Sequence, residues 1–182
     1  MKKWYWRWIL PAIVLFIVLS SGCSSTQAQE ATNMEMTTLE ANKALVRTFN
    51  EAVDKRDYDA LDELLTEDFH RHSAASPEAN ATNRDEMKLF LQATEGTFPD
   101  VQNIVKMMVA EGDMVAVYAT FTGTMDGPMG DIPPTGNRVE APFISFFRIA
   151  DGKIAEMWVE WDNISFLSQL GLFPPSAGNA TE

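Results

Sequence analysis

Residues 138–162 read RVEAPFISFFRIADGKIAEMWVEWD, and this segment decides the fold of the chain. It contains two strand-like apolar runs that meet at Asp151-Gly152, a dipeptide typical of a tight hairpin turn. Because successive side chains of a strand point to opposite faces, alternate residues of the two runs share one face. These residues are Phe143, Ser145 and Phe147 on the first strand and Met157, Val159 and Trp161 on the second. The segment therefore predicts an antiparallel hairpin with one nearly continuous apolar face.

A second hairpin is predicted directly upstream. Two more strand-like runs, at 101–110 and 114–124, are joined by Glu111-Gly112-Asp113. The residues between the two hairpins, 125–136, are rich in glycine and proline and fit neither helical nor strand periodicity. We therefore expect an irregular loop that links two parts of one antiparallel sheet.

Helical periodicity dominates the residues before these strands. Thr37-Thr38-Leu39-Glu40 has the spacing of a capping box, and apolar residues then recur four apart from Ala41 through Val53, which predicts a first helix from residue 37. The other predicted elements are a short helix at 58–65, an extended segment at 69–72, a helix that opens at Asn83 and a closing helix at 163–170. About three N-terminal helices packed on a curved antiparallel sheet make an α+β domain at 37–172, followed by a polar tail at 173–182.

The N-terminus has the features of an export signal at residues 1–22. Three basic residues precede an apolar run at 8–19, and the small residues Ser20, Ser21 and Gly22 follow. The apolar run is shorter than the roughly 20 residues that span a membrane. The stretch that ends at Cys23 resembles a bacterial lipobox, although Ser20 stands where a large aliphatic residue is usual. The alternatives are an ordinary secretory signal and an uncleaved anchor.

Charge and cysteine content limit the partners. The chain has a formal net charge of −12, and removal of the basic signal makes the remainder more acidic. Such a surface repels nucleic acid and anionic lipid head groups, so we expect membrane attachment through acyl chains on Cys23. Residues 23–36 are small and polar and are expected to form a flexible tether. Cys23 is the only cysteine, so its lipidation leaves no thiol for catalysis or metal binding. We expect no cofactor.

Several strings, in their order and spacing, resemble the SnoaL-like polyketide cyclase family, predicted ester cyclases with the nuclear transport factor 2-like cone fold. They are Leu45-Val46-Arg47-Thr48-Phe49, residues 58–65, Asp68-Phe69 with His72, Ile132-Pro133-Pro134-Thr135-Gly136, residues 146–154, then Glu156, Trp158 and Asp162, and finally Gln169-Leu170-Gly171. The resemblance spans about residues 39–171. It implies a cone that encloses one pocket for a hydrophobic, often polycyclic, ligand.

The resemblance also locates the residues that carry the family's chemistry. Members with cyclase activity use an aspartate on the last strand as acid/base, supported by a histidine on the preceding strand. These two positions hold Val159 and Ser145 here, and a third polar position of the family aligns near Arg71. Valine cannot transfer a proton, so the family's aldol ring closure cannot run through position 159.

The expected pocket is almost wholly apolar. Its predicted lining is Phe49, Phe143, Ser145, Phe147, Met157, Val159 and Trp161. Such walls suit a small hydrophobic ligand, and the alternative is that these side chains simply fill a core. The opposite sheet face presents Ile144, Phe146 and Trp158, which we expect either to contact a second copy of the chain or to be partly covered by loops.

His72 and Asp162 are the polar residues expected nearest the pocket mouth, and both are candidate catalytic residues. A carboxylate beside apolar walls has a raised pKa and can act as a general base. The alternative for Asp162 is that it caps the closing helix. His70 and His72 could share a strand face, but no third ligand has suitable spacing, so we predict no metal site.

Two functions therefore compete. In the first, an envelope lipoprotein uses a SnoaL-like domain to bind a small hydrophobic ligand. In the second, the domain is an active, cofactor-independent cyclase or isomerase with Asp162 or His72 as its acid/base. Val159 and Ser145 favour the first, because both positions have lost the family's proton-transfer groups.

Overall fold

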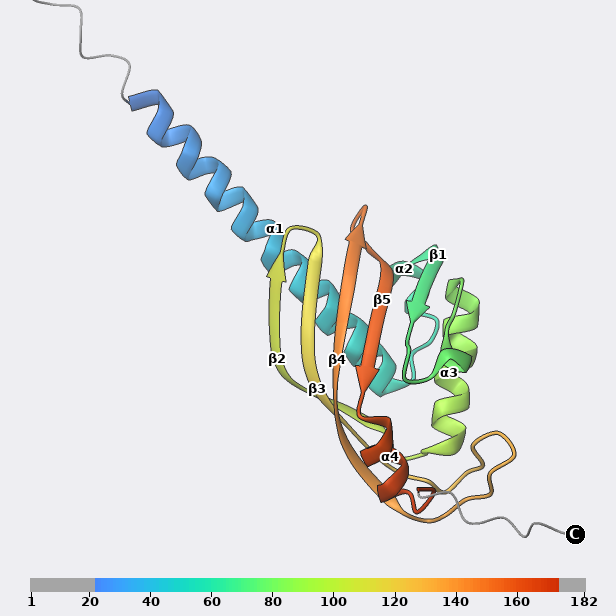
Figure 1. Cartoon of the computed structure of the whole chain (residues 1–182). Coiled ribbons are helices and arrows are strands. Elements are labelled where there is room, and N and C mark those ends of the chain that lie inside the picture. The colour runs from blue at the N-terminus through green and yellow to red at the C-terminus, as the bar shows by residue number, and fades with distance from the viewer. Residues whose placement is uncertain (1–21, 174–182) are drawn as a thin grey trace, which may run out of the picture. The chain divides into compact units, whose positions relative to one another are not determined.

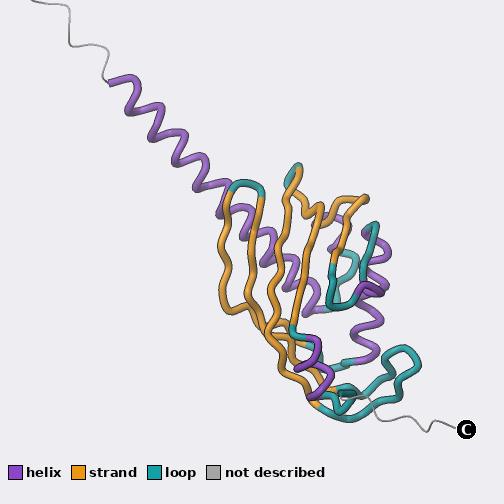
Figure 2. The backbone as a smooth tube through the Cα atoms, viewed as in Figure 1, coloured by secondary structure: helices purple, strands orange, loops and turns teal. Residues whose placement is uncertain are grey.

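A computed structural model describes residues 22–173, with side chains from Gln27 onward (Figures 1 and 2). Its elements in chain order are α1 (Gly22–Lys55), α2 (Leu61–Leu64), β1 (Leu65–His72), a 3-10 turn (Pro77–Ala79), α3 (Arg84–Thr97), β2 (Gln102–Glu111), β3 (Met114–Thr124), β4 (Arg138–Ala150), β5 (Lys153–Trp161) and α4 (Asn163–Gln169). The predicted export signal lies outside the described residues apart from Gly22, and the polar tail apart from Phe173. The side chain of Cys23 is also outside them.

The chain divides into two units, one that ends at Thr37 and one that begins at Thr38. In the first unit, every side chain from Gln27 to Thr37 is exposed. Both hydrophobic cores belong to the second unit, where their residues lie between Leu45 and Leu172. The fold and the site are therefore properties of the second unit.

The first helix begins earlier than its predicted start at residue 37. Thr37 Oγ1 donates a hydrogen bond of 2.8 Å to the carbonyl oxygen of Asn33, so Thr37 lies inside a helical turn and the predicted capping box is wrong. Residues 23–36, expected to form a flexible tether, are helical. Glutamine, alanine, glutamate and methionine make up most of that stretch and are good helix formers, which extends the helix past the capping signature.

The sheet has the strand order β1-β5-β4-β3-β2. The two predicted hairpins are antiparallel, and both residues of the Asp151-Gly152 turn have positive φ, at 50° and 76°, as a tight hairpin turn requires. β1 runs parallel to β5, so the sheet is mixed rather than wholly antiparallel. The fold is α+β with helices packed on an open five-stranded sheet, which confirms the predicted class.

The second predicted helix, expected at 58–65, spans only Leu61–Leu64. β1 begins at Leu65, so it takes the last residue of that prediction and also residues 66–68, which were assigned to neither element. Leu65 is fully buried and pairs with Ile154 of β5. α3 begins where it was predicted to begin: Asn83 Oδ1 accepts a hydrogen bond from the Glu86 N–H at 2.9 Å. α1 packs on the inner sheet face through Phe49, whose ring meets that of Phe147 edge to face at 5.8 Å between ring centroids.

The irregular loop at 125–136 is fastened to the end of α3. The Gly127 N–H donates to the Thr97 carbonyl oxygen at 3.0 Å, and Thr97 Oγ1 donates to the Pro128 carbonyl oxygen at 2.8 Å. A Cβ atom at Gly127 would lie 1.8 Å from the Gly96 carbonyl oxygen, so only glycine fits this approach. The loop thereby brings Met129 to the wall of the cavity described below.

Candidate functional site

A cavity of about 390 Å³ lies in the second unit, lined by residues of α1, α3 and the inner sheet face. Its volume falls within the range of roughly 300–1,000 Å³ that small-molecule sites occupy. All seven residues predicted to line a pocket border it, namely Phe49, Phe143, Ser145, Phe147, Met157, Val159 and Trp161. The inner face therefore leaves a space rather than simply filling a core. That these residues contact a ligand stays a prediction.

Strand register builds the main wall. Ser145 of β4 lies between Val117 of β3 and Val159 of β5, and Phe143 pairs with Trp161 in the next row. These side chains therefore point into one space from three neighbouring strands. Ser145 and Val159 are therefore direct cross-strand neighbours on this wall.

Arg71 is the charged residue most deeply buried at the cavity, with 3% of its surface exposed. β1 pairs with β5 at Arg71 and Met157, which turns Arg71 to the inner face. Its Nη1 donates to the Ala79 carbonyl oxygen at 2.7 Å, and its guanidinium carbon lies 4.3 Å from the centre of the Phe90 ring. Burial lowers the pKa of Arg71 to about 10, so the side chain stays positively charged at neutral pH.

Two further polar groups on the cavity wall have no partner in the described part of the protein. Ser145 is fully buried and its Oγ has no hydrogen-bond partner, and the same holds for the buried Nε1 of Trp161. Arg71 Nε is a third such atom. Buried polar groups nearly always have partners in folded proteins, so these three atoms mark the wall as more than packing surface.

Asp54 and Tyr58 also line the cavity, and sequence reasoning missed both. The Asp54 carboxylate accepts a hydrogen bond from the Asn103 N–H at 3.3 Å, and burial raises its pKa above the ordinary value. Tyr58 donates to Glu95 at 2.9 Å, and burial together with this carboxylate raises the pKa of Tyr58 to about 12. Asp54 directly follows Val53, an apolar residue of the first helix, and this position in the sequence could have indicated that Asp54 lies near the cavity.

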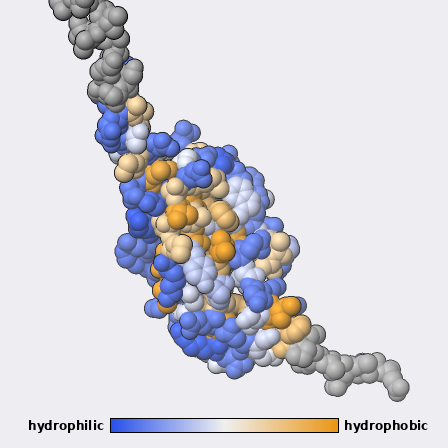
Figure 3. All heavy atoms as spheres, turned by 60° about the vertical axis from the view of Figure 1, so that its left-hand side comes forward, coloured by the Kyte–Doolittle hydropathy of each residue, from blue (hydrophilic) through white to orange (hydrophobic). Residues whose placement is uncertain are grey.

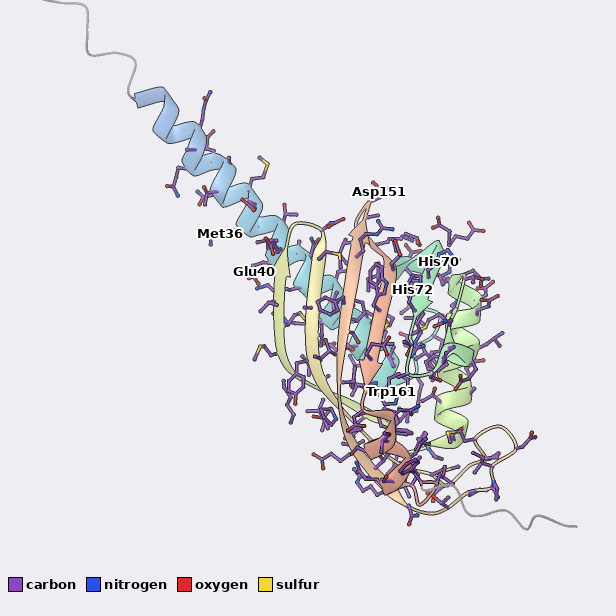
Figure 4. The ribbon with its side chains drawn as sticks, in the orientation of Figure 1. Met36, Glu40, His70, His72, Asp151 and Trp161 are labelled. Atoms are coloured by element: carbon purple, nitrogen blue, oxygen red, sulfur yellow. The ribbon has the colours of Figure 1, made fainter. Side chains whose placement is uncertain are left out.

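His72 lies on the opposite face of the sheet. It pairs with Trp158 in the register of β1 and β5, and the two rings stack with centroids 5.1 Å apart. His72 Nε2 contacts Glu156 Oε2 at 3.2 Å, and Glu156 also binds Arg148. Figure 4 shows His70 and His72 together on β1. His72 is not among the residues that line the cavity, so the predicted approach to the pocket mouth is not observed.

Asp162 caps α4, which was the alternative to its catalytic role. Its carboxylate accepts a hydrogen bond from the Ser165 N–H at 3.0 Å, and the residue is exposed and does not line the cavity. The neighbouring Glu160 accepts hydrogen bonds from the Ala74 and Ala75 N–H groups at 2.6 and 2.9 Å, which fastens the loop after β1 to β5. The structure therefore brings neither predicted catalytic residue to the cavity.

Two other features, a cluster of metal ligands and a membrane-spanning helix, are absent from residues 22–173. No group of three or more His, Cys, Asp or Glu side chains there is arranged to hold a metal ion. No helix in that range is both long enough and apolar enough to cross a membrane.

An apolar cavity between helices and the inner face of an open mixed sheet defines the nuclear transport factor 2-like type of domain. The chain belongs to the SnoaL-like polyketide cyclase family, whose sequence profile matches residues 43–170. That range includes every residue that lines the cavity. A search of curated proteins finds no match.

Solved structures of the same type are similar along most of their length. IdmH, a proposed polyketide cyclase from Streptomyces antibioticus, is 29% identical with a TM-score of 0.63, over 71% of this chain and 98% of that one. AclR, a proposed hydroxylase from Streptomyces galilaeus, is also 29% identical with a TM-score of 0.64, over 75% and 84%. A proposed SnoaL-like polyketide cyclase from Jannaschia sp. CCS1 shares the fold at 24% identity and a TM-score of 0.67, over 75% and 95%.

Proposed function

We propose that this chain is an envelope lipoprotein whose SnoaL-like domain binds a small hydrophobic ligand and lacks the family's aldol acid/base. The observation that carries the proposal is the pair Ser145 and Val159 at the wall of the cavity. Valine has no proton to exchange, and no base in the described residues bonds to Ser145 Oγ. General acid/base help is worth about 10²–10⁴-fold in rate, so its loss removes most of the original chemistry while apolar binding remains.

The lining supports a hydrophobic ligand. Phe49, Phe143 and Phe147 contribute three aromatic side chains, and Met157 adds a flexible apolar one that adapts to irregular shapes. Apolar walls with a few polar groups are typical of small-molecule sites. The expected guest is therefore a molecule with a largely hydrocarbon body.

Location at the envelope rests on the sequence around Cys23. Two or more acyl chains hold a protein stably on a membrane, and an acidic chain needs such an anchor because it repels anionic lipid. Labelling of producing cells with a clickable fatty acid tests this. The wild type should be labelled and Cys23→Ala should not. Equal labelling of both would refute lipidation.

Ligand binding is tested by native mass spectrometry of residues 24–182, which keep the whole of both cores. Wild type should release an apolar molecule unchanged. Val159→Phe, which places a larger side chain in the cavity, should release less, and Ile144→Ala on the outer face should release as much as wild type. Chemical conversion of the released molecule by wild type would contradict the loss of catalysis.

A second function, a cyclase or isomerase, is favoured by one observation. Asp54 lines the cavity and burial raises its pKa, which suits a general base that removes a proton next to a carbonyl. In heavy water, such an enzyme would exchange deuterium into a ketone ligand at the carbon beside the carbonyl. Asp54→Asn would stop this exchange, whereas Asp162→Asn would leave it unchanged. Absence of exchange in wild type would reject this second function.

A further inference from the structure

Three buried polar atoms at one cavity lack partners, and all three can donate a hydrogen bond. They are Arg71 Nε, Ser145 Oγ and Trp161 Nε1. The arginine and tryptophan nitrogens are donors only, and the serine hydroxyl can donate or accept. A buried donor without a partner lowers the stability of the protein. A ligand with acceptor oxygens can therefore form hydrogen bonds that no group of the protein forms with these donors.

The charge of Arg71 also has no direct ion-pair partner, although Asp54 and Glu78 line the same cavity. Arg71 is 97% removed from solvent, as its 3% exposure shows, and forms no ion pair within the described residues. Its guanidinium contacts the Phe90 ring and the Ala79 carbonyl oxygen instead of a carboxylate. A buried charge normally has an ionic partner, because transfer from water is costly.

The acidic groups around Arg71 are occupied elsewhere. Glu78 lines the cavity and accepts from the Ser76 hydroxyl at 2.7 Å. Asp54 accepts from the Asn103 N–H, and Glu160 accepts from the loop after β1. Glu160 and Glu78 attract Arg71 through space, and neither is paired with it in the described residues. Arg71 Nε is thus available to donate a hydrogen bond to a ligand.

We propose that the ligand is a hydrophobic carboxylic acid whose carboxylate binds Arg71, with Ser145 and Trp161 donating to further ligand oxygens. The inference deepens the proposed function and rests on it. Next to Arg71, the unpartnered donors favour an anionic oxygen group over an ammonium, because the guanidinium repels a second positive charge. The aromatic and aliphatic walls hold the hydrocarbon body of the same molecule.

A matched pair of fluorescent probes tests this: cis-parinaric acid and its methyl ester, titrated into residues 24–182. Wild type should bind the acid about 10- to 100-fold more tightly than the ester, the range expected for hydrogen bonds to a charged group. Arg71→Gln should remove this preference while ester affinity stays within about twofold. Arg148→Gln, which changes an arginine on the outer face, should keep the preference.

The outcomes separate the two proposals. Equal binding of acid and ester by wild type would overturn the carboxylate proposal and leave hydrophobic binding intact. Binding of neither probe would overturn both. A preference that survives in Arg71→Gln would also overturn the role of Arg71. Thermal unfolding monitors the fold of each variant, and Arg71→Lys, which keeps the charge, should retain part of the preference if Arg71→Gln does not fold.

Discussion

The two faces of the same three strands, β3, β4 and β5, differ in what their apolar residues do. On the inner face, Phe147 is 1% exposed and packs beside a cavity. On the outer face, its chain neighbour Phe146 is 47% exposed and pairs across the strands with Trp158. Both faces thus carry large aromatic side chains, although the outer face also carries the charged residues Arg148 and Glu156. Among the described residues of these two faces, buried polar atoms without hydrogen-bond partners occur only on the inner face. Such atoms distinguish the proposed binding surface from a surface that is only apolar.

Figure 3 shows hydrophobic side chains gathered in one area of the surface and bordered by hydrophilic ones. The exposed apolar residues of the sheet are Ile104, Val105, Met107, Val109, Tyr118, Ile144 and Phe146. Contiguous exposed apolar patches commonly mark contacts between proteins. This agrees with the expectation that two copies pair through the sheet, which stays a proposal.

The largest expected effect contrasts the two neighbouring phenylalanines. Phe147→Ala should lower the free energy of unfolding by about 3–5 kcal/mol, because it removes a buried aromatic ring from the core. Phe146→Ala should lower it by about 1 kcal/mol or less, since the ring is half exposed. Urea unfolding at low protein concentration measures both. Similar losses for the two variants would break the distinction between the faces.

The next prediction concerns self-association through the outer face. Ile144→Lys should convert a dimer to a monomer at micromolar concentration, because it buries a charge in the proposed contact. The new lysine faces Glu160 across the strand pair, so the fold should tolerate it. Leu89→Lys, at an exposed position on α3, is the matched control and should stay dimeric. Light scattering gives the masses, and a monomeric wild type would refute the dimer.

A smaller effect is expected at Arg71. Its pKa is lowered by burial, so at neutral pH the folded protein bears the cost of a poorly solvated charge. Arg71→Met removes the charge and keeps an unbranched apolar stem, and should raise the free energy of unfolding by about 1–2 kcal/mol. Denaturant unfolding of the ligand-free protein checks this. A loss of stability would instead assign Arg71 a structural role on the inner face.

The smallest expected effect lies in the ion pairs of the outer face. A hydrogen bond from Arg148, and a second from His72, hold the pKa of Glu156 below its ordinary value of 4.5. The resulting stability is present above that value and is lost as the pH falls through the lowered pKa of the folded state. Glu156→Gln should therefore cost less than about 1 kcal/mol at pH 7 and nothing in strong acid. Unfolding curves across this pH range test the sign.

Local patterns predicted much of this molecule because they depend on neighbours in sequence. Alternation on β4 and β5 placed Ser145 and Val159 on the inner face, and Asn83 marked the start of α3. The partner of β1 could not be predicted, because its pairing with β5 joins distant segments. Without that register, a shift of one residue exchanges Arg71 and His72 between the faces. Sequence reasoning chose the histidine, and the structure puts the arginine inside.

The parallel pairing of β1 with β5 also has a consequence for the order in which parts of the chain fold. Ala74, just after β1, is fastened to Glu160, which lies 86 residues further along the chain. Contacts between such distant segments form late, because a long loop must close first. The wall that holds Arg71 is therefore completed only when the end of β5 has been synthesised and has docked. A chain truncated before Lys153 would lack Met157, Val159 and Trp161 of the cavity wall and the strand that pairs with β1, so we expect the proposed ligand to bind only after β5 has docked.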